Sequence, residues 1–212
     1  MRPIHAPALA LCAVLIATAS GGAQQTASLD LLRRAVNPNP TLQSYTASAS
    51  LSATLHVLIP VHKVLAGNVY YLKPRRKIAF QNVPGPLSRF KDLAASSPTY
   101  DEAIAKYTIT ALTDDGTLST HKLVPKTAGH VASVTVKVND ASALIAHAQW
   151  AYTNGGSLSF DQTYTTIGVF RLPAKANIGA RFPGYSVDGT LTFSNYQPNA
   201  PVSSSVFASP AP

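Results

Sequence analysis

The strongest constraint on the fold is a stretch of alternating apolar and polar side chains in the first third of the chain. Every odd position from Tyr45 to Ile59 is apolar, and the even positions are Ser, Thr or His with the exception of Leu58. A period of two puts the apolar side chains on one face of a β-strand. Such a strand would be about 50 Å long, whereas most strands have about five or six residues. We therefore expect it to bend, as strands do in barrels and half-barrels.

Further segments have the composition of strands, and turn sequences connect some of them. They cover residues 69–72, 77–81, 107–113, 118–124, 131–138, 146–153, 158–165, 168–172 and 186–196. Asp114-Asp115-Gly116 and Asn154-Gly155-Gly156 are turn sequences that predict β-hairpins. Strands joined in this way favour one continuous antiparallel sheet over parallel βαβ units.

A short helix is predicted at Ser28–Val36, ahead of the alternating stretch. Ser28 can cap its N-terminus, and Leu29, Leu32 and Val36 fall on one face at helical spacing. The Asn-Pro-Asn-Pro sequence at 37–40 ends the helix, because proline lacks an amide donor and restricts the residue before it.

The remaining helical signals lie together in the middle of the chain. A helix from Leu87 to Ala95 would carry an apolar stripe that includes Phe90 and Leu93. We expect this helix to act as a lid, with Leu87, Phe90 and Leu93 facing the sheet. Thr99 and Glu102 then follow in the pattern of a capping box, which predicts another helix start.

These signals predict a mainly β protein of the α+β class. We expect a single, strongly curved antiparallel sheet, a half-barrel, with helices covering its open, apolar side. A chain of 212 residues is long enough to bury a sizeable core, and the half-barrel domain is expected to span residues 24–197.

The two ends of the chain are expected to lie outside this domain. Met1–Ala23 combines a short basic start, an apolar run too short to cross a bilayer and small residues at its end, as in a signal peptide. Cys12 is the only cysteine and lies in that run, so the exported chain would have no disulfide. Residues 198–212 are rich in Pro, Ser and Ala and are predicted to be disordered.

The charge pattern argues against a nucleic-acid partner. The formal net charge is +8, but only 12% of residues are charged, about half the usual share. The only cluster of bases is formed by Lys73, Arg75, Arg76 and Lys77. Nucleic-acid binding calls for a stripe of bases with exposed aromatic residues between them, and the sequence has none.

No arrangement of residues typical of catalysis or metal binding is present in the sequence. The six histidines form no HxH, HxxH or HExxH pair, and four of the nine acidic residues, Asp114, Asp115, Asp140 and Asp188, are explained by turn sequences. There is no G-x-S-x-G elbow and no phosphate-binding glycine loop. We expect no catalytic residue, metal or cofactor, although a pair of carboxylates brought together by the fold stays open.

Aromatic and aliphatic side chains gather on the predicted strands instead. A single sheet with few helices would leave a concave apolar face, and such a face is a natural ligand cavity. The residues predicted to line it are Tyr45, Leu51, Leu55, Tyr71, Phe80, Trp150, Tyr152, Phe160, Tyr164 and Phe170. An ordinary core is the alternative explanation for each of these residues taken singly.

The segment Gly67-Asn68-Val69-Tyr70-Tyr71-Leu72-Lys73-Pro74, followed by Arg75 and Phe80, resembles a strand of the periplasmic outer-membrane lipoprotein-sorting (LolA-like) carriers. Tyr107-Thr108-Ile109, the turn at 114–116 and Leu123-Val124-Pro125-Lys126 resemble that family's next hairpin. The resemblance covers roughly residues 27 to 196. It implies an open half-barrel with a helical lid and a non-covalent activity, the shielding of a lipoprotein's acyl chains in the periplasm. Related lipid-binding and stress-sensing proteins share the fold, so the fold does not decide the ligand.

The sequence therefore predicts a non-catalytic carrier, exported to the periplasm or cell envelope, that binds a lipid or the acyl chain of a lipoprotein. A membrane-bound donor or acceptor protein is a further expected partner. An alternative is an envelope interaction or stress-sensing module whose cavity is filled by its own side chains. A secreted hydrolase ranks third, because it requires a converging acid–base pair.

Overall fold

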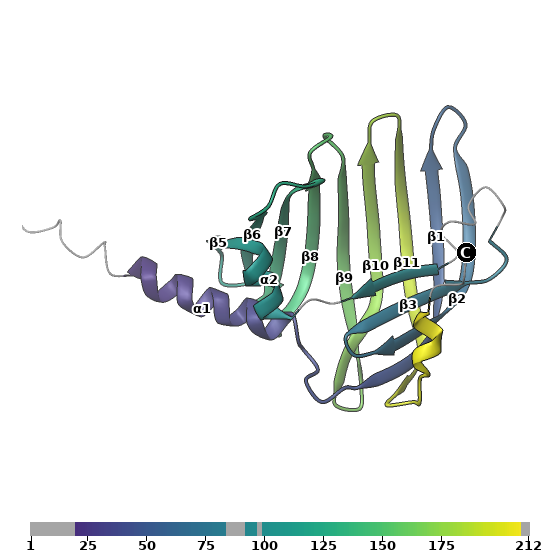
Figure 1. Ribbon diagram of the computed structural model, residues 1–212, viewed down its shortest axis with the longest axis horizontal. Coiled ribbons are helices and arrows are strands. Elements are labelled where there is room, and N and C mark those ends of the chain that lie inside the picture. Colours follow the sequence, from purple (N-terminus) through teal and green to yellow (C-terminus); the bar gives the residue numbers. More distant parts are fainter. Residues whose placement is uncertain (1–19, 84–91, 97–98, 209–212) are drawn as a thin grey trace, which may run out of the picture.

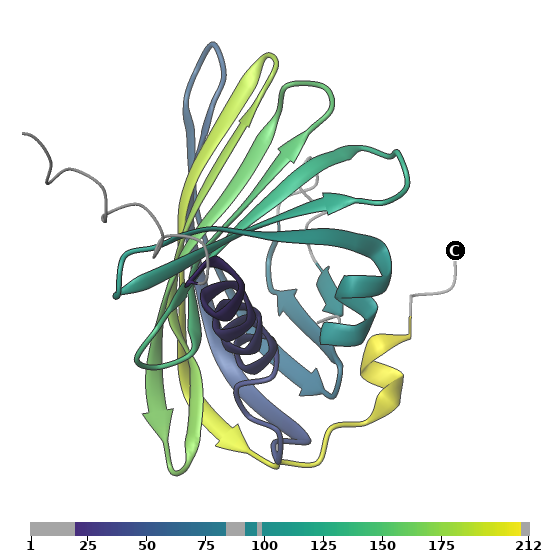
Figure 2. The same ribbon diagram turned by 90° about the vertical axis from the view of Figure 1, so that its left-hand side faces the viewer.

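The computed structural model describes residues 20–83, 92–96 and 99–208. Within them, eleven strands form one antiparallel sheet in the order β4-β3-β2-β1-β11-β10-β9-β8-β7-β6-β5. The sheet is strongly curved, and β4 and β5 are its two edges, so the half-barrel is open (Figure 1; Figure 2). The predicted fold class is confirmed.

The strands are long, and several exceed ten residues. They are β1 (Ser44–His56), β2 (Val61–Leu72), β3 (Arg75–Phe80), β4 (Asp92–Ser96), β5 (Tyr107–Asp114), β6 (Leu118–Pro125), β7 (Val131–Asn139), β8 (Leu144–Tyr152), β9 (Ser157–Ile167), β10 (Phe170–Phe182) and β11 (Tyr185–Pro198). The two predicted hairpins are confirmed, since β5 pairs with β6 and β8 pairs with β9.

The alternating stretch forms β1, but the strand ends three residues earlier than predicted. Its first apolar positions, Tyr45, Ala47 and Ala49, are buried as the period of two requires. The chain leaves the strand after His56, and residues 57–60 form the turn to β2. The end of the strand agrees with Pro60, which cannot donate a hydrogen bond to a neighbouring strand. β2 then begins at Val61, eight residues before the predicted start.

Helix α1 (Ser20–Ala35) is longer than the predicted helix and crosses the concave side of the sheet (Figure 2). Its side chains Leu31, Leu32 and Ala35 are buried against β6 and β7, in a cluster that contains Leu123, Val134, Val136 and Val138. Helix α2 (Tyr100–Lys106) begins with the predicted capping box. The Glu102 amide donates to Thr99 Oγ1 at 3.2 Å, and the Thr99 amide donates to Glu102 Oε2 at 2.8 Å.

The predicted lid helix is wrong over its second half. Asp92–Ser96 forms the edge strand β4, and Leu93 lies opposite Ile78 of β3 in the register. Backbone pairing with the free edge of β3 satisfies the amide and carbonyl groups of this segment, and that gain outweighs a weak helical spacing. Leu87 and Phe90 lie outside the described residues.

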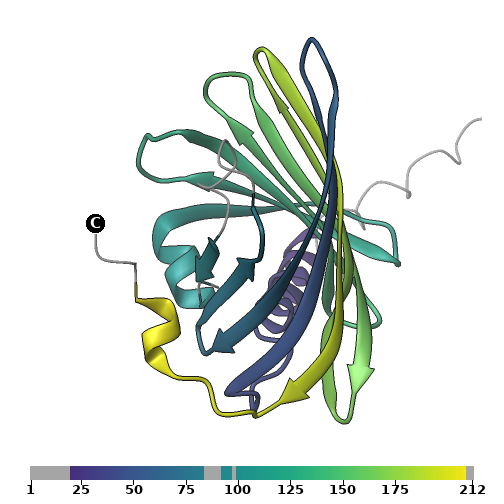
Figure 3. The same ribbon diagram turned by 90° about the vertical axis from the view of Figure 1, so that its right-hand side faces the viewer.

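A disordered tail is predicted at residues 198–212, but the segment up to residue 208 has defined secondary structure and contacts. The Asn199 amide donates to the Ser44 carbonyl at 2.7 Å, and Ser204–Phe207 form a 3₁₀ helix, η2. Lys77 Nζ donates to the Val206 carbonyl at 3.1 Å, and the Arg75 guanidinium lies 4.8 Å from the centre of the Phe207 ring. These contacts with β3 give a Pro- and Ser-rich segment enough partners to be ordered (Figure 3).

The core consists of two clusters. The first, which we name the strand cluster, lies on β1–β3 and β9–β11 and includes Tyr45, Val69, Phe80 and Leu172 among its buried residues. The second is the cluster between α1 and β6–β7. Helix α1 therefore covers one half of the concave side. On the other half, the core is formed by side chains of the strands and the neighbouring loop residues.

We predict that Gly67→Ala destabilises the protein. Gly67 lies on β2, where an added Cβ would approach the Ala79 carbonyl oxygen to 2.7 Å and Phe80 Cδ1 to 3.0 Å. The backbone oxygen cannot move aside without disturbing β3, so we expect a loss of about 1–3 kcal/mol in the free energy of unfolding.

Urea unfolding followed by circular dichroism measures this change. Gly129→Ala is the matched control, because a Cβ at Gly129 meets nothing within 4 Å. Equal stability of the two variants would show that the β2–β3 contact at Gly67 is looser than the structure indicates.

Candidate functional site

The concave face of the sheet is apolar across many strands. Residues paired across antiparallel strands point to the same face. One such row joins Leu65 on β2, Leu51 on β1, Leu191 on β11 and Ala176 on β10. Leu65, Leu191 and Ala176 are buried, and Leu51 packs against them. The strand cluster therefore occupies the inner side of the half-barrel.

The two described α-helices lie over only one half of this face. Helix α1 packs against β5, β7 and β8, and α2 packs against β5 (Figure 1). On the other half, several apolar side chains are only partly buried. They include Leu51, Phe160, Ile178 and Phe193. This half of the concave face therefore presents apolar surface from four strands.

The structure places most of the predicted cavity residues on this face. Tyr45 and Phe80 are buried in the strand cluster, and Leu51, Tyr71, Phe160 and Phe170 pack at its margin. Trp150 belongs to the cluster beneath α1, and its ring meets the Phe160 ring edge-on at 5.7 Å, so this pair links the two clusters.

Three further predicted cavity residues belong to neither of the two core clusters. Leu55 is near the end of β1 and pairs with Val61 of β2. Tyr152 packs on Phe182 of β10, with ring centres 5.4 Å apart. Tyr164 donates a hydrogen bond from its hydroxyl to the Ile145 carbonyl at 3.0 Å.

Tyrosine rings and one arginine form a second feature of the face. The Tyr45 ring stacks on Tyr71 at 4.9 Å and meets Tyr196 edge-on at 5.4 Å. Arg76 of β3 lies opposite Tyr71 in the register, and its guanidinium is near enough to the Tyr45 hydroxyl to act on the pKa of that group. We name these residues together with Tyr164 the tyrosine–arginine cluster.

Burial dominates the electrostatics of this cluster. It raises the pKa of Tyr45, Tyr71 and Tyr196, and it raises the pKa of Tyr164 to about 12. The positive charge of Arg76 acts in the opposite direction on the pKa of all four hydroxyls.

Arg76 has no carboxylate partner among the described residues. Its partly buried guanidinium is therefore a cation beside an apolar surface and neutral tyrosines. Such a group can bind an additional anion or carbonyl oxygen.

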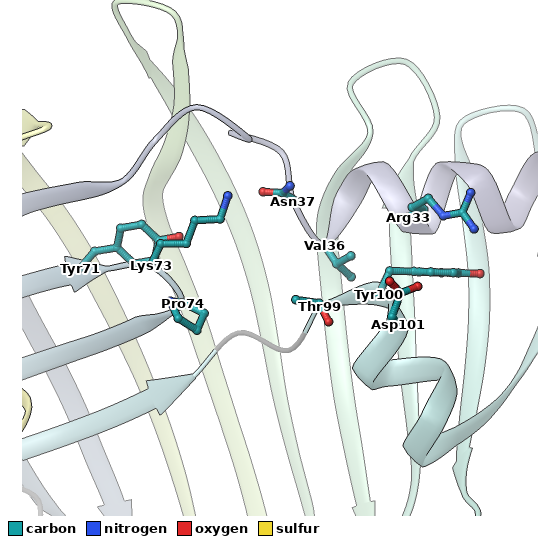
Figure 4. A pocket seen from close by; sticks show the side chains of 9 residues that line it. All are labelled: Arg33, Val36, Asn37, Tyr71, Lys73, Pro74, Thr99, Tyr100 and Asp101. Atoms are coloured by element: carbon teal, nitrogen blue, oxygen red, sulfur yellow. The ribbon is translucent and has the colours of Figure 1, made fainter.

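A pocket of about 240 Å³ opens where the two halves of the concave side meet (Figure 4). It lies between the C-terminal end of α1, the β2–β3 turn and the start of α2. Its lining is mixed: Arg33, Val36, Asn37, Tyr71, Lys73, Pro74, Thr99, Tyr100 and Asp101. The Arg33 guanidinium lies 4.8 Å from the centre of the Tyr100 ring, and Lys73 Nζ donates to the Pro40 carbonyl at 3.0 Å. Tyr71 joins this pocket to the tyrosine–arginine cluster.

The histidines have separate structural environments. His121 of β6 is fully buried beneath α1, with its Nε2 3.5 Å from Ser28 Oγ, and burial lowers its pKa. His147 pairs with Asp161 at 2.7 Å, and His56 pairs with Asp188 at 3.1 Å. In the described part of the chain, no three side chains of the metal-binding types come together.

Sequence reasoning missed several residues of this face. Arg76 was counted only as one of a cluster of bases, although it shares the inward parity of Ile78 and Phe80 on β3. Ile178 was missed because β10 extends to Phe182, ten residues beyond the segment predicted there. Tyr196 lies inside its predicted strand but was not chosen as a cavity residue. The sequence could have indicated that Arg76 lies on the same face of β3 as Ile78 and Phe80. It gave no signal for the length of β10.

Comparison with solved structures identifies the fold. A proposed outer membrane lipoprotein-sorting protein domain from Vibrio parahaemolyticus is similar with a TM-score of 0.57 and 11% identity, covering 84% of this chain and 95% of that one. A LolA superfamily protein from Nitrosomonas europaea gives 0.58 and 9%, covering 86% and 97%. A DUF1329 family protein from Desulfovibrio piger gives 0.53 and 12%, covering 86% and 96%.

These similarities place the chain in a class of folds, the open, curved antiparallel sheets with a helix on the concave side. Within that class the chain has the LolA-like fold, as the resemblance of its strands predicted. No protein-family profile and no curated protein matches the sequence. Among the described residues, no helix has the length and apolar character needed to span a membrane.

We predict that the tyrosine–arginine cluster makes the protein sensitive to alkaline pH. A tyrosine whose folded-state pKa is raised contributes stability that is fully present below its unfolded pKa of 10 and is lost as the pH rises through its folded pKa. For Tyr164 this loss should extend from pH 10 to about 12.

Urea unfolding at a series of pH values measures the loss, and tyrosinate absorbance reports ionisation directly. In Tyr164→Phe the decline above pH 10 should be shallower than in the unaltered protein. The same slope in both proteins would contradict the burial of this hydroxyl.

Proposed function

We propose that this protein is a non-catalytic carrier, exported to the periplasm or cell envelope, that shields a lipid or the acyl chain of a lipoprotein on the concave face of its sheet. The observation that carries the proposal is the partly exposed apolar surface of the strand cluster, on the half of the sheet that α1 leaves free. A flexible hydrocarbon chain suits a broad, weakly featured apolar surface better than a small polar molecule does.

The magnitude of acyl-chain burial is sufficient for binding. Each buried methylene contributes about 0.8 kcal/mol, so a chain of a dozen carbons offers roughly 10 kcal/mol before ordering and desolvation are subtracted. A carrier must also release its ligand, and a shallow face shaped by side chains such as Leu51 and Phe193 favours release. A membrane-bound donor or acceptor protein would be the partner for loading or unloading.

A solved structure with this fold supports the proposal, because its description as an outer membrane lipoprotein-sorting protein domain agrees with acyl-chain binding. The concave apolar face of this chain supplies the independent physical argument.

Arg76 gives the proposed site a polar end. Its guanidinium lies beside Tyr45 and Tyr71, at the edge of the strand cluster, without a carboxylate partner in the described residues. We infer that it binds an anionic group of the ligand, such as a carboxylate, while the hydrocarbon lies along the strands. Charge-assisted hydrogen bonds of this kind are about twice as strong as neutral ones.

The second candidate is an envelope interaction or stress-sensing module whose cavity is filled by its own side chains. The observation that favours it is the nearly complete burial of Val69, Phe80 and Leu172, because these side chains already fill part of the concave side. Such a module would not bind a fatty acid on the concave face.

Displacement of a fluorescent fatty acid tests the site. Leu51→Thr places a hydroxyl on the concave face while keeping a good strand former, and we expect affinity to fall about tenfold. Ser50→Thr is the control, because Ser50 is the exposed neighbour on the opposite face of β1. Absence of binding by the well-folded unaltered protein, or equal affinities of the two variants, would favour the interaction module.

The role of Arg76 is tested with a fatty acid and its methyl ester. Arg76→Gln should weaken binding of the fatty acid about tenfold and leave binding of the ester nearly unchanged, because only the acid has a charge to lose. Competition against the same fluorescent probe measures both. An equal loss for acid and ester would assign Arg76 a structural role only.

A further inference from the structure

The turn between β1 and β2 exposes large aliphatic side chains that none of the described residues covers. Leu58 is fully exposed and Ile59 is 78% exposed, with Val57 beside them at 44%. The two strands pair as far as Leu55 and Val61, so the turn is held at the end of a regular hairpin. It lies at the top of the molecule in each of the three views (Figure 1; Figure 2; Figure 3).

These side chains contribute nothing to either core cluster. Adjacent, fully solvated aliphatic residues on a protruding hairpin lower solubility, and an interaction site is the usual reason for them. By contrast, the β9–β10 turn at the opposite end of the sheet exposes a single aliphatic side chain, Val169, at 84%.

The chain around the tip carries an exposed lysine and no acidic residue. The sequence contains no Asp or Glu from Leu31 to Lys91. His62 and Lys63 of β2 are exposed, and Lys63 forms no salt bridge with any described residue. On the adjacent β11, Asp188 is paired with Arg181 at 2.6 Å and with His56 at 3.1 Å. The Arg181 guanidinium offsets the negative charge of this carboxylate.

We propose that the tip of the β1–β2 hairpin inserts into the headgroup region of a bilayer that contains anionic lipid. Peripheral membrane anchors combine a small apolar area with flanking cations, as Leu58, Ile59 and Lys63 do here. Pro60 also suits this place, because it has no amide donor to leave unsatisfied among acyl chains.

A lipid surface fits the tip better than a protein partner does. A stable protein interface buries about 800 Å² on each partner, whereas a few aliphatic side chains on one turn provide much less. The inference goes beyond the proposed carrier function and does not depend on it, since Leu58 and Ile59 lie outside the strand cluster.

Co-sedimentation with lipid vesicles tests the proposal. The purified protein should bind vesicles of phosphatidylethanolamine and phosphatidylglycerol, bind vesicles of phosphatidylcholine more weakly, and lose affinity as the salt concentration rises. The double variant Leu58→Ser with Ile59→Ser should bind the anionic vesicles at least about tenfold more weakly. Val169→Ser removes an equally exposed aliphatic side chain from the opposite end and should bind as the unaltered protein does.

The proposal is overturned if the unaltered protein does not bind anionic vesicles, as expected of a tip that serves a protein partner. It is also overturned if the double variant binds like the unaltered protein, or if Val169→Ser loses as much affinity. Fatty-acid binding by the same proteins separates the two proposals. If a protein fails to bind vesicles but still binds the fatty acid, the result bears on the membrane proposal and leaves the carrier proposal unaffected. If it binds vesicles but not the fatty acid, the result bears on the carrier proposal alone.

Discussion

The structure depends on a mismatch between a broad apolar sheet face and the helices available to cover it. Eleven described strands curve around one side, and α1 buries its apolar stripe against the half of the sheet formed by β5–β8. The remaining half is closed at its base by buried residues such as Val69, Phe80 and Leu172, with partly exposed side chains around them. Burying apolar surface is the main favourable term in folding, so surface that is left partly exposed stays available for a ligand.

Polar groups divide this protein into regions of different chemistry. The tyrosine–arginine cluster lies at one border of the apolar face, where burial keeps its hydroxyls neutral and Arg76 supplies the only charge. Acidic residues are absent from Leu31 to Lys91, so the strands that carry Arg76 and the β1–β2 turn form a cationic section of the chain. An amphiphile with an anionic end and an anionic lipid surface are both complementary to such a section.

Local patterns predicted much of the fold, and long-range pairing determined the rest. The alternation at Tyr45–Ala49, the two hairpin turns and the Thr99–Glu102 capping box were readable because each depends on neighbouring residues only. The strand at Asp92–Ser96 and the ordered segment at Ser204–Phe207 were not, because both are held by contacts with β3, far away in sequence. For the candidate site, aromatic residues on strands identified Tyr45, Tyr71 and Phe160. Which of them would share a cluster depended on the sheet order, and no local signal encodes that order.

The most direct test of the central claim is methyl NMR of the protein in the presence of a spin-labelled fatty acid. Paramagnetic broadening reports which methyl groups lie near the bound chain. We expect broadening of Leu51 and Ile178, which lie on the apolar concave face, and sharp signals from Val64 and Val169, which are exposed elsewhere. Sharp signals from Leu51 and Ile178 at saturating fatty acid, or equal broadening of all four residues, would contradict the account.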